Sequence, residues 1–184
     1  MTPFTACGTV ADYAIFDEEL VALKPKNLTF DQAASIPLIG LTSYQALVEH
    51  TKLQKGEKVL ILGGSSAVGM FAIQLAHAIG ARVVTTASAK NANFVKGLGA
   101  ERVINYHTQP VQPAKFGAKN CGNLLVYPTA KGLDEITEYL EKGSIVPVID
   151  TVYEFEKLQP ALTKLKGRHA RGKLVIQVNP ESQG

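Results

Sequence analysis

The sequence has no tryptophan, only two cysteines and no long hydrophobic run. Cys7 and Cys121 lie far apart and outside any metal-binding spacing, so a reduced, intracellular compartment is the default expectation. The lack of a long apolar stretch argues against a membrane protein. The first residues lack a charged start followed by an apolar segment, so no secretory signal is expected and the default localisation is cytoplasmic.

Concentrated charge and clustered metal ligands are missing as well. The net charge of +3 comes from basic residues scattered along the chain, which argues against nucleic-acid binding and leaves RNA binding through a basic face as the weakest alternative. The four histidines are well separated, so we predict neither a zinc site nor any other bound metal ion. What the chain does have is length and apolar content: 184 residues, 46% of them hydrophobic, can bury a substantial core.

Strand and helix patterns alternate through the middle of the chain. Short apolar runs indicate buried strands, and an i, i+3, i+4 stripe after Gly69 indicates a helix that Gly80 ends. Such alternation needs crossover connections and predicts a parallel sheet, here a shortened Rossmann-type, doubly wound α/β fold. The predicted elements are strands over 58–62, 82–86 and 102–105, with helices over 69–79 and 91–98 between them.

The flanking segments are expected to add further elements. Residues 106–122 contain Pro110, Pro113, Gly117 and Gly122 with little periodicity, and are interpreted as a loop or as the position of a missing segment. The other predicted elements are strands over 9–23, 123–127, 145–149 (at an edge, because of Pro147) and 173–178, and helices over 31–36, 37–50, 133–141 and 155–165.

A glycine-rich loop, GGSSAVG over residues 63–69, joins the first of the alternating strands to its helix. Glycines permit the sharp turn, and the helix N-terminus presents free N–H groups that suit a pyrophosphate. Read as G-x-G-x-x-G, the loop has Gly64 and Gly69 at the outer positions but Ser66 in the middle. A side chain there either crowds the ligand or donates a hydrogen bond to it, and we favour the second interpretation. The alternative for the loop as a whole is a tight turn without a ligand.

The end of the second strand indicates which nucleotide is bound. An acidic residue at this point would bind the ribose 2′-hydroxyl of NAD, but the sequence is ASAK, with Ser88 and Lys90. Without a carboxylate nothing repels a 2′-phosphate, and Lys90 could pair with it, so NADPH is favoured over NADH. The alternative for Lys90 is a solvated surface lysine.

Several motifs resemble the zinc-independent quinone oxidoreductase branch of the medium-chain dehydrogenase/reductase family, which includes zeta-crystallin-like and enoyl-reductase-like enzymes. They follow the order of the family's own motifs through most of the chain. The matching stretches are GTVADY (8–13), QAASIPLIGLTSYQAL (32–47), VLILGGSSAVGMFAIQLAHAIGARVV (59–84), LGA (98–100), VINY (103–106) and GKLVI (172–176).

The resemblance implies three parts of the chain: residues 1–36 as the remnant of a GroES-like β substrate domain, 37–143 as the nucleotide-binding domain with an internal deletion near 107–122, and 144–184 returning to the substrate domain. Thr42 would lie near the nicotinamide and Tyr106 near the adenosine 2′-phosphate. Thr42 has the alternative of capping or packing a helix, and Tyr106 that of an ordinary half-buried tyrosine. The predicted cofactor-binding residues are Thr42, Gly64, Ser65, Ser66, Ala67, Val68, Gly69, Ser88, Lys90 and Tyr106.

The family also implies hydride transfer from NADPH to a quinone or an α,β-unsaturated carbonyl such as an enoyl compound, and often a homodimer. No catalytic residue is predicted, because the hydride comes from the cofactor and solvent can protonate the product. Much of the substrate domain and several strand–helix units of the family have no counterpart in this sequence. The alternative function is therefore a catalytically impaired nucleotide-binding or interaction protein derived from such an enzyme.

Overall fold

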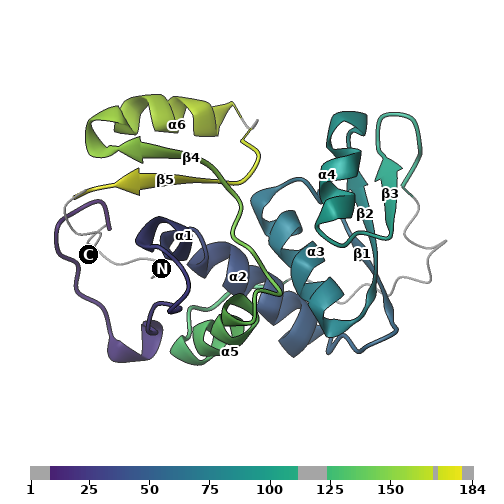
Figure 1. Ribbon diagram of the computed structural model, residues 1–184, viewed down its shortest axis with the longest axis horizontal. Coiled ribbons are helices and arrows are strands. Elements are labelled where there is room, and N and C mark those ends of the chain that lie inside the picture. Colours follow the sequence, from purple (N-terminus) through teal and green to yellow (C-terminus); the bar gives the residue numbers. More distant parts are fainter. Residues whose placement is uncertain (1–8, 112–123, 168–169, 180–184) are drawn as a thin grey trace.

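The computed structural model describes residues 9–111, 124–167 and 170–179 of the chain. These residues form two parallel sheets, one of three strands and one of two. The two sheets lie towards opposite ends of the molecule, with helices α2 (Pro37–Tyr44) and α3 (Ala67–Ile79) between them (Figure 1). The predicted α/β class with parallel sheets is confirmed, and the proposed domain boundaries after residues 36 and 143 remain predictions.

The three-stranded sheet is the predicted strand–helix alternation. Its strands run in the order β1 (Lys58–Ile61), β2 (Arg82–Ala87), β3 (Arg102–Asn105), and both neighbouring pairs are parallel. The connection from β1 to β2 is α3, and β2 leads to β3 through the 3₁₀ turn η3 (Ala89–Asn91) and helix α4 (Ala92–Gly97). Central strand β2 is buried from its second residue onwards, as its apolar sequence predicts.

Helix α3 has clear start and stop signals. The Ser66 side chain accepts a hydrogen bond from the Gly69 amide at 3.1 Å and so caps the N-terminus. Gly80 ends the helix in the left-handed conformation, with φ of +88°, where a residue without a β-carbon is unstrained. Between these ends the residues from Gly69 to Ala76 are all buried, so α3 is the central helix of the molecule.

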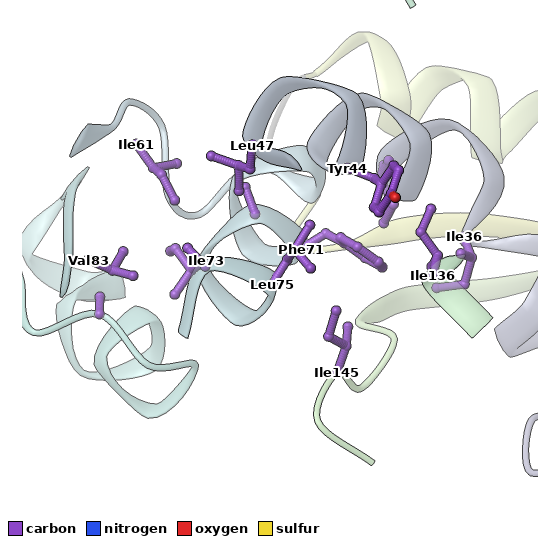
Figure 2. Close-up of a cluster of buried hydrophobic side chains, with 14 of the residues drawn as sticks. Ile36, Tyr44, Leu47, Ile61, Phe71, Ile73, Leu75, Val83, Ile136 and Ile145 are labelled. Atoms are coloured by element: carbon purple, nitrogen blue, oxygen red, sulfur yellow. The ribbon is translucent and has the colours of Figure 1, made fainter. Parts of the chain in front are cut away.

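One hydrophobic core joins the sheet to the helices. Helix α2 continues as a π-helical turn, η2 (Gln45–His50), and packs against both α3 and α5 (Ala130–Glu141). Figure 2 shows the resulting cluster, in which Val83 of β2, Ile73 and Phe71 of α3, and Ile136 of α5 follow one another from the sheet to the helices. Burial of each such side chain contributes about 1.5–3 kcal/mol.

The two-stranded sheet contains β4 (Ile149–Glu154) and β5 (Lys173–Gln177), which pair in parallel. The connection between them consists of the 3₁₀ turn η5 (Phe155–Lys157) and helix α6 (Leu158–Lys166), which lies over the sheet (Figure 1). Helix α1 (Phe30–Ala34), predicted from residue 31, begins with a reciprocal capping box between Thr29 and Gln32 and contacts β5.

The strand predicted over residues 9–23 is wrong. Over these described residues the chain forms only the 3₁₀ turn η1 (Glu18–Leu20), and Tyr13 and Ile15 are 93% and 90% exposed. A strand is stable only where an adjacent strand pairs with its backbone N–H and C=O groups. Alternating apolar residues in the sequence do not show whether such an adjacent strand exists.

The strand predicted over 123–127 is also absent. In this segment the described residues begin at Leu124, and none of them up to Tyr127 belongs to a strand. Here a side chain, and not a neighbouring strand, forms the hydrogen bonds to the backbone. Gln45, which is 5% exposed, donates from Nε2 to the Tyr127 carbonyl at 2.6 Å and accepts from the Tyr127 amide at 3.1 Å. Both backbone groups of this residue are thereby satisfied without a sheet.

The same arrangement occurs in the strand predicted over 145–149, of which only the last residue, Ile149, belongs to a strand. Ile145 is 1% exposed because it packs into the helical core. The buried Gln74 of α3 accepts from the Val146 amide at 2.9 Å and donates to its carbonyl at 3.1 Å. Among the other predictions, the loop after Tyr106 is confirmed to residue 111, and residues 112–122 lie outside the described part.

Candidate nucleotide-binding site

All of the predicted cofactor residues except Thr42 follow a strand of the three-stranded sheet at one edge. Because its strands are parallel, the carboxyl ends of β1, β2 and β3 meet at the same edge, where α/β proteins bind their ligands. The glycine loop follows β1, Ser88 and Lys90 follow β2, and Tyr106 follows β3. Three segments separated in sequence are therefore brought together by the topology of the sheet.

The glycine loop is held against β2 by hydrogen bonds that its backbone amides donate to Thr86. Gly63 has φ of +71°, a conformation that favours glycine, and its amide donates to Thr86 Oγ1 at 2.8 Å. The Gly64 amide donates to the Thr86 carbonyl at 2.9 Å. Thr86 thus fixes two consecutive residues of the turn, a role that the sequence analysis did not assign to it.

Gly64 and Gly69 are needed because protein atoms leave no room for a side chain. A β-carbon on Gly64 would collide with Oγ1 of Thr85 and lie 3.0 Å from Cδ1 of Ile73. A β-carbon on Gly69 would collide with the carbonyl oxygen of Gly63 and lie 2.9 Å from Cα of Gly64. These two glycines of the fingerprint therefore allow the strand, the loop and the helix to pack closely.

Ser66, in the middle position of the fingerprint, is exposed and caps α3. Its oxygen accepts from the Gly69 amide, which leaves the hydroxyl hydrogen free to donate to a second group. The structure therefore gives Ser66 a role in the protein itself that sequence reasoning missed. A serine three residues before Gly69 at the start of a helix was the available signal.

The first turn of α3 supplies donors for an anion. Ala67 and Val68 occupy the first two helical positions, where amides have no carbonyl acceptor within the helix. Both residues, like Ser65, are only partly buried. With the partial positive charge of the helix N-terminus, this arrangement suits a phosphate or pyrophosphate group.

Ser88 and Lys90 lie on the turn that follows β2. Ser88 precedes η3, and its carbonyl accepts from the Asn91 amide at 3.0 Å, while Lys90 is exposed within the turn. Tyr106 follows β3 and is 52% exposed, with its ring tilted by 42° against His107 at a centroid distance of 4.3 Å. A cation, a hydroxyl group and an aromatic ring thus occur at adjacent strand ends.

Thr42 lies on α2, and its Oγ1 donates to the Leu38 carbonyl at 2.6 Å. Threonine side chains in helices often form this bond to the carbonyl four residues earlier. Its neighbour Ser43 donates to the Ile39 carbonyl at 2.8 Å and approaches the Val68 carbonyl at 3.3 Å. Ser43 therefore ties α2 to the first turn of α3. Thr42 stands next to that connection, and its role toward a nicotinamide remains a prediction.

A cluster of ionic groups orders the segment that enters β5. Asp150 is bonded by the Lys164 ammonium group and the Thr151 hydroxyl at Oδ1, and it accepts from the Arg171 amide at Oδ2 over 2.7 Å. These donors, with that of Lys164 foremost, lower the pKa of Asp150 from its ordinary value of 3.8 to about 2. Sequence reasoning did not identify this cluster, because its members come from three separate elements.

One cavity lies apart from this edge. An apolar hollow of about 290 Å³ is lined by segments around Leu23, Phe30 and Leu133, and shares no lining residue with the predicted cofactor set. Within the described residues, no three His, Cys, Asp or Glu side chains are grouped as metal ligands. No helix in the same part of the chain has the length and apolar character needed to cross a membrane.

Comparison with known proteins places the chain in a family. A family model described as zinc-binding dehydrogenase matches residues 35–176. The 2-methylene-furan-3-one reductase of Solanum lycopersicum is 35% identical, over 94% of this chain and 53% of the relative, so the chain spans about half the length of that protein.

Two solved structures share the fold. An NAD-dependent alcohol dehydrogenase superposes with a TM-score of 0.80 at 27% identity, over 94% of this chain and 66% of that one. The quinone oxidoreductase from Coxiella burnetii superposes with a TM-score of 0.72 at 28% identity, over 85% of this chain and 63% of that one. The chain belongs to the zinc-binding dehydrogenase family, in the quinone oxidoreductase branch of the medium-chain dehydrogenases/reductases.

Proposed function

We propose that the chain binds NADPH at the carboxyl edge of the three-stranded sheet and reduces a quinone or an α,β-unsaturated carbonyl compound. The observation that carries the proposal is the convergence of a capped helix N-terminus, a glycine turn and the Ser88–Lys90 turn at one sheet edge. When bound, NADPH supplies a hydride. The residues of this chain would hold and orient it.

The pyrophosphate would lie on the first turn of α3. The amides of Ala67 and Val68 are donors at the helix N-terminus, and the Ser66 hydroxyl keeps one hydrogen for a phosphate oxygen. The exposure of Ser66 supports its interpretation as a donor, because a ligand can reach this residue from solvent. Ser65 and the backbone of Gly64 complete this part of the proposed site.

The adenosine 2′-phosphate would lie by the turn after β2. Lys90 supplies a cation and Ser88 a hydroxyl group, and the turn from Ala87 to Asn91 contains no carboxylate that would repel a dianion. Tyr106, at the end of the adjacent strand β3, offers a half-exposed ring to the adenosine. The names of the related proteins do not decide between the two nucleotides, since one of the solved structures is NAD-dependent.

The acceptor class is supported by two of these proteins. One is named for a methylene-furanone, which is an α,β-unsaturated ketone, and another for quinones. We propose no catalytic residue of the chain, since solvent can protonate the reduced product. We also propose a homodimer, which the family resemblance of the sequence implies and which sedimentation velocity can test.

A second candidate is nucleotide binding without turnover. It is favoured because the residues that support the first proposal are all assigned to the nucleotide and none of them is assigned to the acceptor. Parts of an enzyme that position the acceptor against the nicotinamide determine its rate, and a small displacement lowers that rate steeply. NADPH oxidation with a panel of quinones and enones distinguishes the two candidates. Turnover above background supports the reductase, and tight binding without turnover supports the second candidate.

The cofactor itself is tested by titration of the wild-type chain and of Lys90→Asp with NADPH and NADH. Replacing the cation by an anion should weaken NADPH about tenfold or more and NADH less than about twofold, because only NADPH carries the 2′-phosphate. Lys96→Asp is the matched control, since Lys96 is an exposed lysine on the neighbouring helix α4 and lies outside the proposed site. Equal losses for both nucleotides would refute the 2′-phosphate assignment.

A further inference from the structure

The apolar hollow between α1 and α5 has the size of a small-molecule site. Its volume is about 290 Å³, close to the lower end of the range of about 300–1,000 Å³ that is usual for such sites. Among its lining residues, Ile36 and Leu140 are 4% and 1% exposed, whereas Leu23 and Phe30 are 91% and 51% exposed. The hollow therefore combines a buried apolar wall with apolar side chains that a ligand could cover.

Hydrogen bonds tie the walls of the hollow together. The segment that leads into α1 is bonded to α5 by Asn27, whose Nδ2 donates to the Leu140 carbonyl at 2.9 Å. The Lys26 amide donates to Oε1 of Glu141 at 3.0 Å, and α1 itself begins with the capping box described above. The two sides of the hollow are thereby held in place before any ligand arrives, which lowers the entropic cost of binding.

Among the described residues that line the hollow, Lys24 is the only charged one. Its Nζ donates to the carbonyls of Pro25, at 3.2 Å, and Leu28, at 2.5 Å. The same nitrogen lies 5.3 Å from the centroid of the Phe30 ring, which also lines the hollow. An ammonium group has three N–H donors, so one remains for a ligand beside this ring.

The side chains around Lys24 supply no negative charge to it. None of the ion pairs formed among the described residues includes Lys24, and Glu138 of α5 pairs instead with Lys142 at 3.0 Å. Thr137, the other polar residue in the lining, donates from its hydroxyl to the Leu133 carbonyl at 2.9 Å. The hollow thus presents one cation beside a largely apolar surface, and the complementary ligand is an anion with an apolar body.

We propose that the hollow binds a small monocarboxylate with a hydrocarbon chain, whose carboxylate pairs with Lys24 and whose chain covers the apolar wall between α1 and α5. The carboxylate balances the charge of the ammonium group and accepts its remaining N–H. The chain removes Leu23 and Phe30 from water, which is favourable in proportion to the apolar area buried. A single lysine suits a monoanion, because a second negative charge would have no partner in the hollow. The site shares no lining residue with the predicted cofactor set and does not rest on the proposed function.

Octanoate is the probe, and octanamide, which has the same chain without the charge, is its matched control. Both are titrated into the full chain by calorimetry at neutral pH, where a carboxylic acid is ionised. Octanamide should bind roughly tenfold more weakly than octanoate, because it lacks the charge-assisted hydrogen bond to Lys24. Butanoate should also bind more weakly, by about fourfold for each methylene group that no longer lies in the hollow.

Three variants locate the site. Lys24→Gln should weaken octanoate roughly tenfold and octanamide less than about twofold, because only octanoate uses the charge. Lys26→Gln is the matched control, since Lys26 is an exposed lysine of the same segment that does not line the hollow, and both affinities should stay within about twofold. Ala33→Leu enlarges a side chain of the lining and should weaken octanoate and octanamide by a similar factor.

Several results would overturn the proposal. Equal binding of octanoate and octanamide to the wild-type chain would do so, and this comparison holds even where Lys24→Gln fails to fold by circular dichroism. A Lys24→Gln chain that folds and keeps the preference for octanoate would do so as well. Octanoate should bind equally well with and without saturating NADPH, and competition between them would assign octanoate to the nucleotide site instead. If octanoate does not bind and Leu23→Ser converts a dimer into a monomer in sedimentation velocity, a second copy of the chain covers the hollow and the proposal is wrong.

Discussion

Gly69→Ala tests whether the glycine loop is built by close backbone packing. The added β-carbon would collide with the Gly63 carbonyl oxygen and lie 2.9 Å from the Gly63 carbonyl carbon and from Gly64 Cα. All three are backbone atoms, so no change of rotamer relieves the contact and either the loop or the helix must move. Overpacking of this kind costs about 1–3 kcal/mol, against about 1 kcal/mol gained in helix propensity. Because the gain offsets part of the cost, we expect a net loss of up to about 2 kcal/mol.

The displacement should affect ligand binding more than stability. The Gly69 amide is capped by Ser66, and the Gly63 amide bonds Thr86 at 2.8 Å, so a shift of either residue disturbs the amides proposed to bind the pyrophosphate. We expect the dissociation constant for NADPH to rise at least about tenfold, because several short hydrogen bonds lose their alignment together.

Gly97→Ala is the matched control. Gly97 lies in helix α4, and no atom lies within 4 Å of the β-carbon it would gain. The same chemical change should therefore stabilise the chain by about 0.5–1 kcal/mol through helix propensity alone. Urea unfolding followed by circular dichroism gives both free energies, and nucleotide titration gives both affinities. If Gly69→Ala matches Gly97→Ala in stability and binding, the close packing described for the loop is wrong.

Two further predictions concern stability. Asp150→Asn should cost up to about 2 kcal/mol near neutral pH, because the pKa of Asp150 is lowered to about 2 and its stabilising effect exists above 3.8. The penalty should disappear as pH falls from 3.8 to about 2, and a penalty of equal size in acid would contradict the assignment. Gln74→Leu should cost about 2 kcal/mol in urea unfolding, since it leaves both backbone groups of Val146 unpaired, whereas exposed Gln54→Leu should change little. Equal effects would show that the Gln74 amide is not needed.

The half of the fold that contains the three-stranded sheet could be predicted because its signals are local. The apolar run of β1, the stripe of α3 and the left-handed Gly80 lie within a few turns of one another, and local periodicity determines each element. The expected strands at 9–23, 123–127 and 145–149 depended on neighbours that no local pattern specifies. In two of them a glutamine amide binds the backbone that a neighbouring strand would have bound.

The glycines of the loop could be predicted for the same reason, but the ionic contacts could not. Gly64 and Gly69 follow a spacing that the geometry of a strand–turn–helix unit requires. Arg171 contacts Asn91 across 80 residues, and an isolated arginine before a strand carries no signal of its partner. Thr86 is similar, because its bond to Gly63 depends on the register of β1 against β2.

The three glycine positions of the fingerprint have different roles, and this difference explains why the middle one can be a serine. At the outer positions protein atoms exclude a β-carbon, so glycine is needed whether or not a nucleotide binds. The middle residue is exposed, and only a ligand could restrict its size. Serine at that position caps α3, which is worth about 1 kcal/mol relative to alanine, and it retains a hydrogen for an approaching phosphate. The departure from the glycine pattern thus stabilises the helix whose N-terminus forms the proposed site, and leaves that site open.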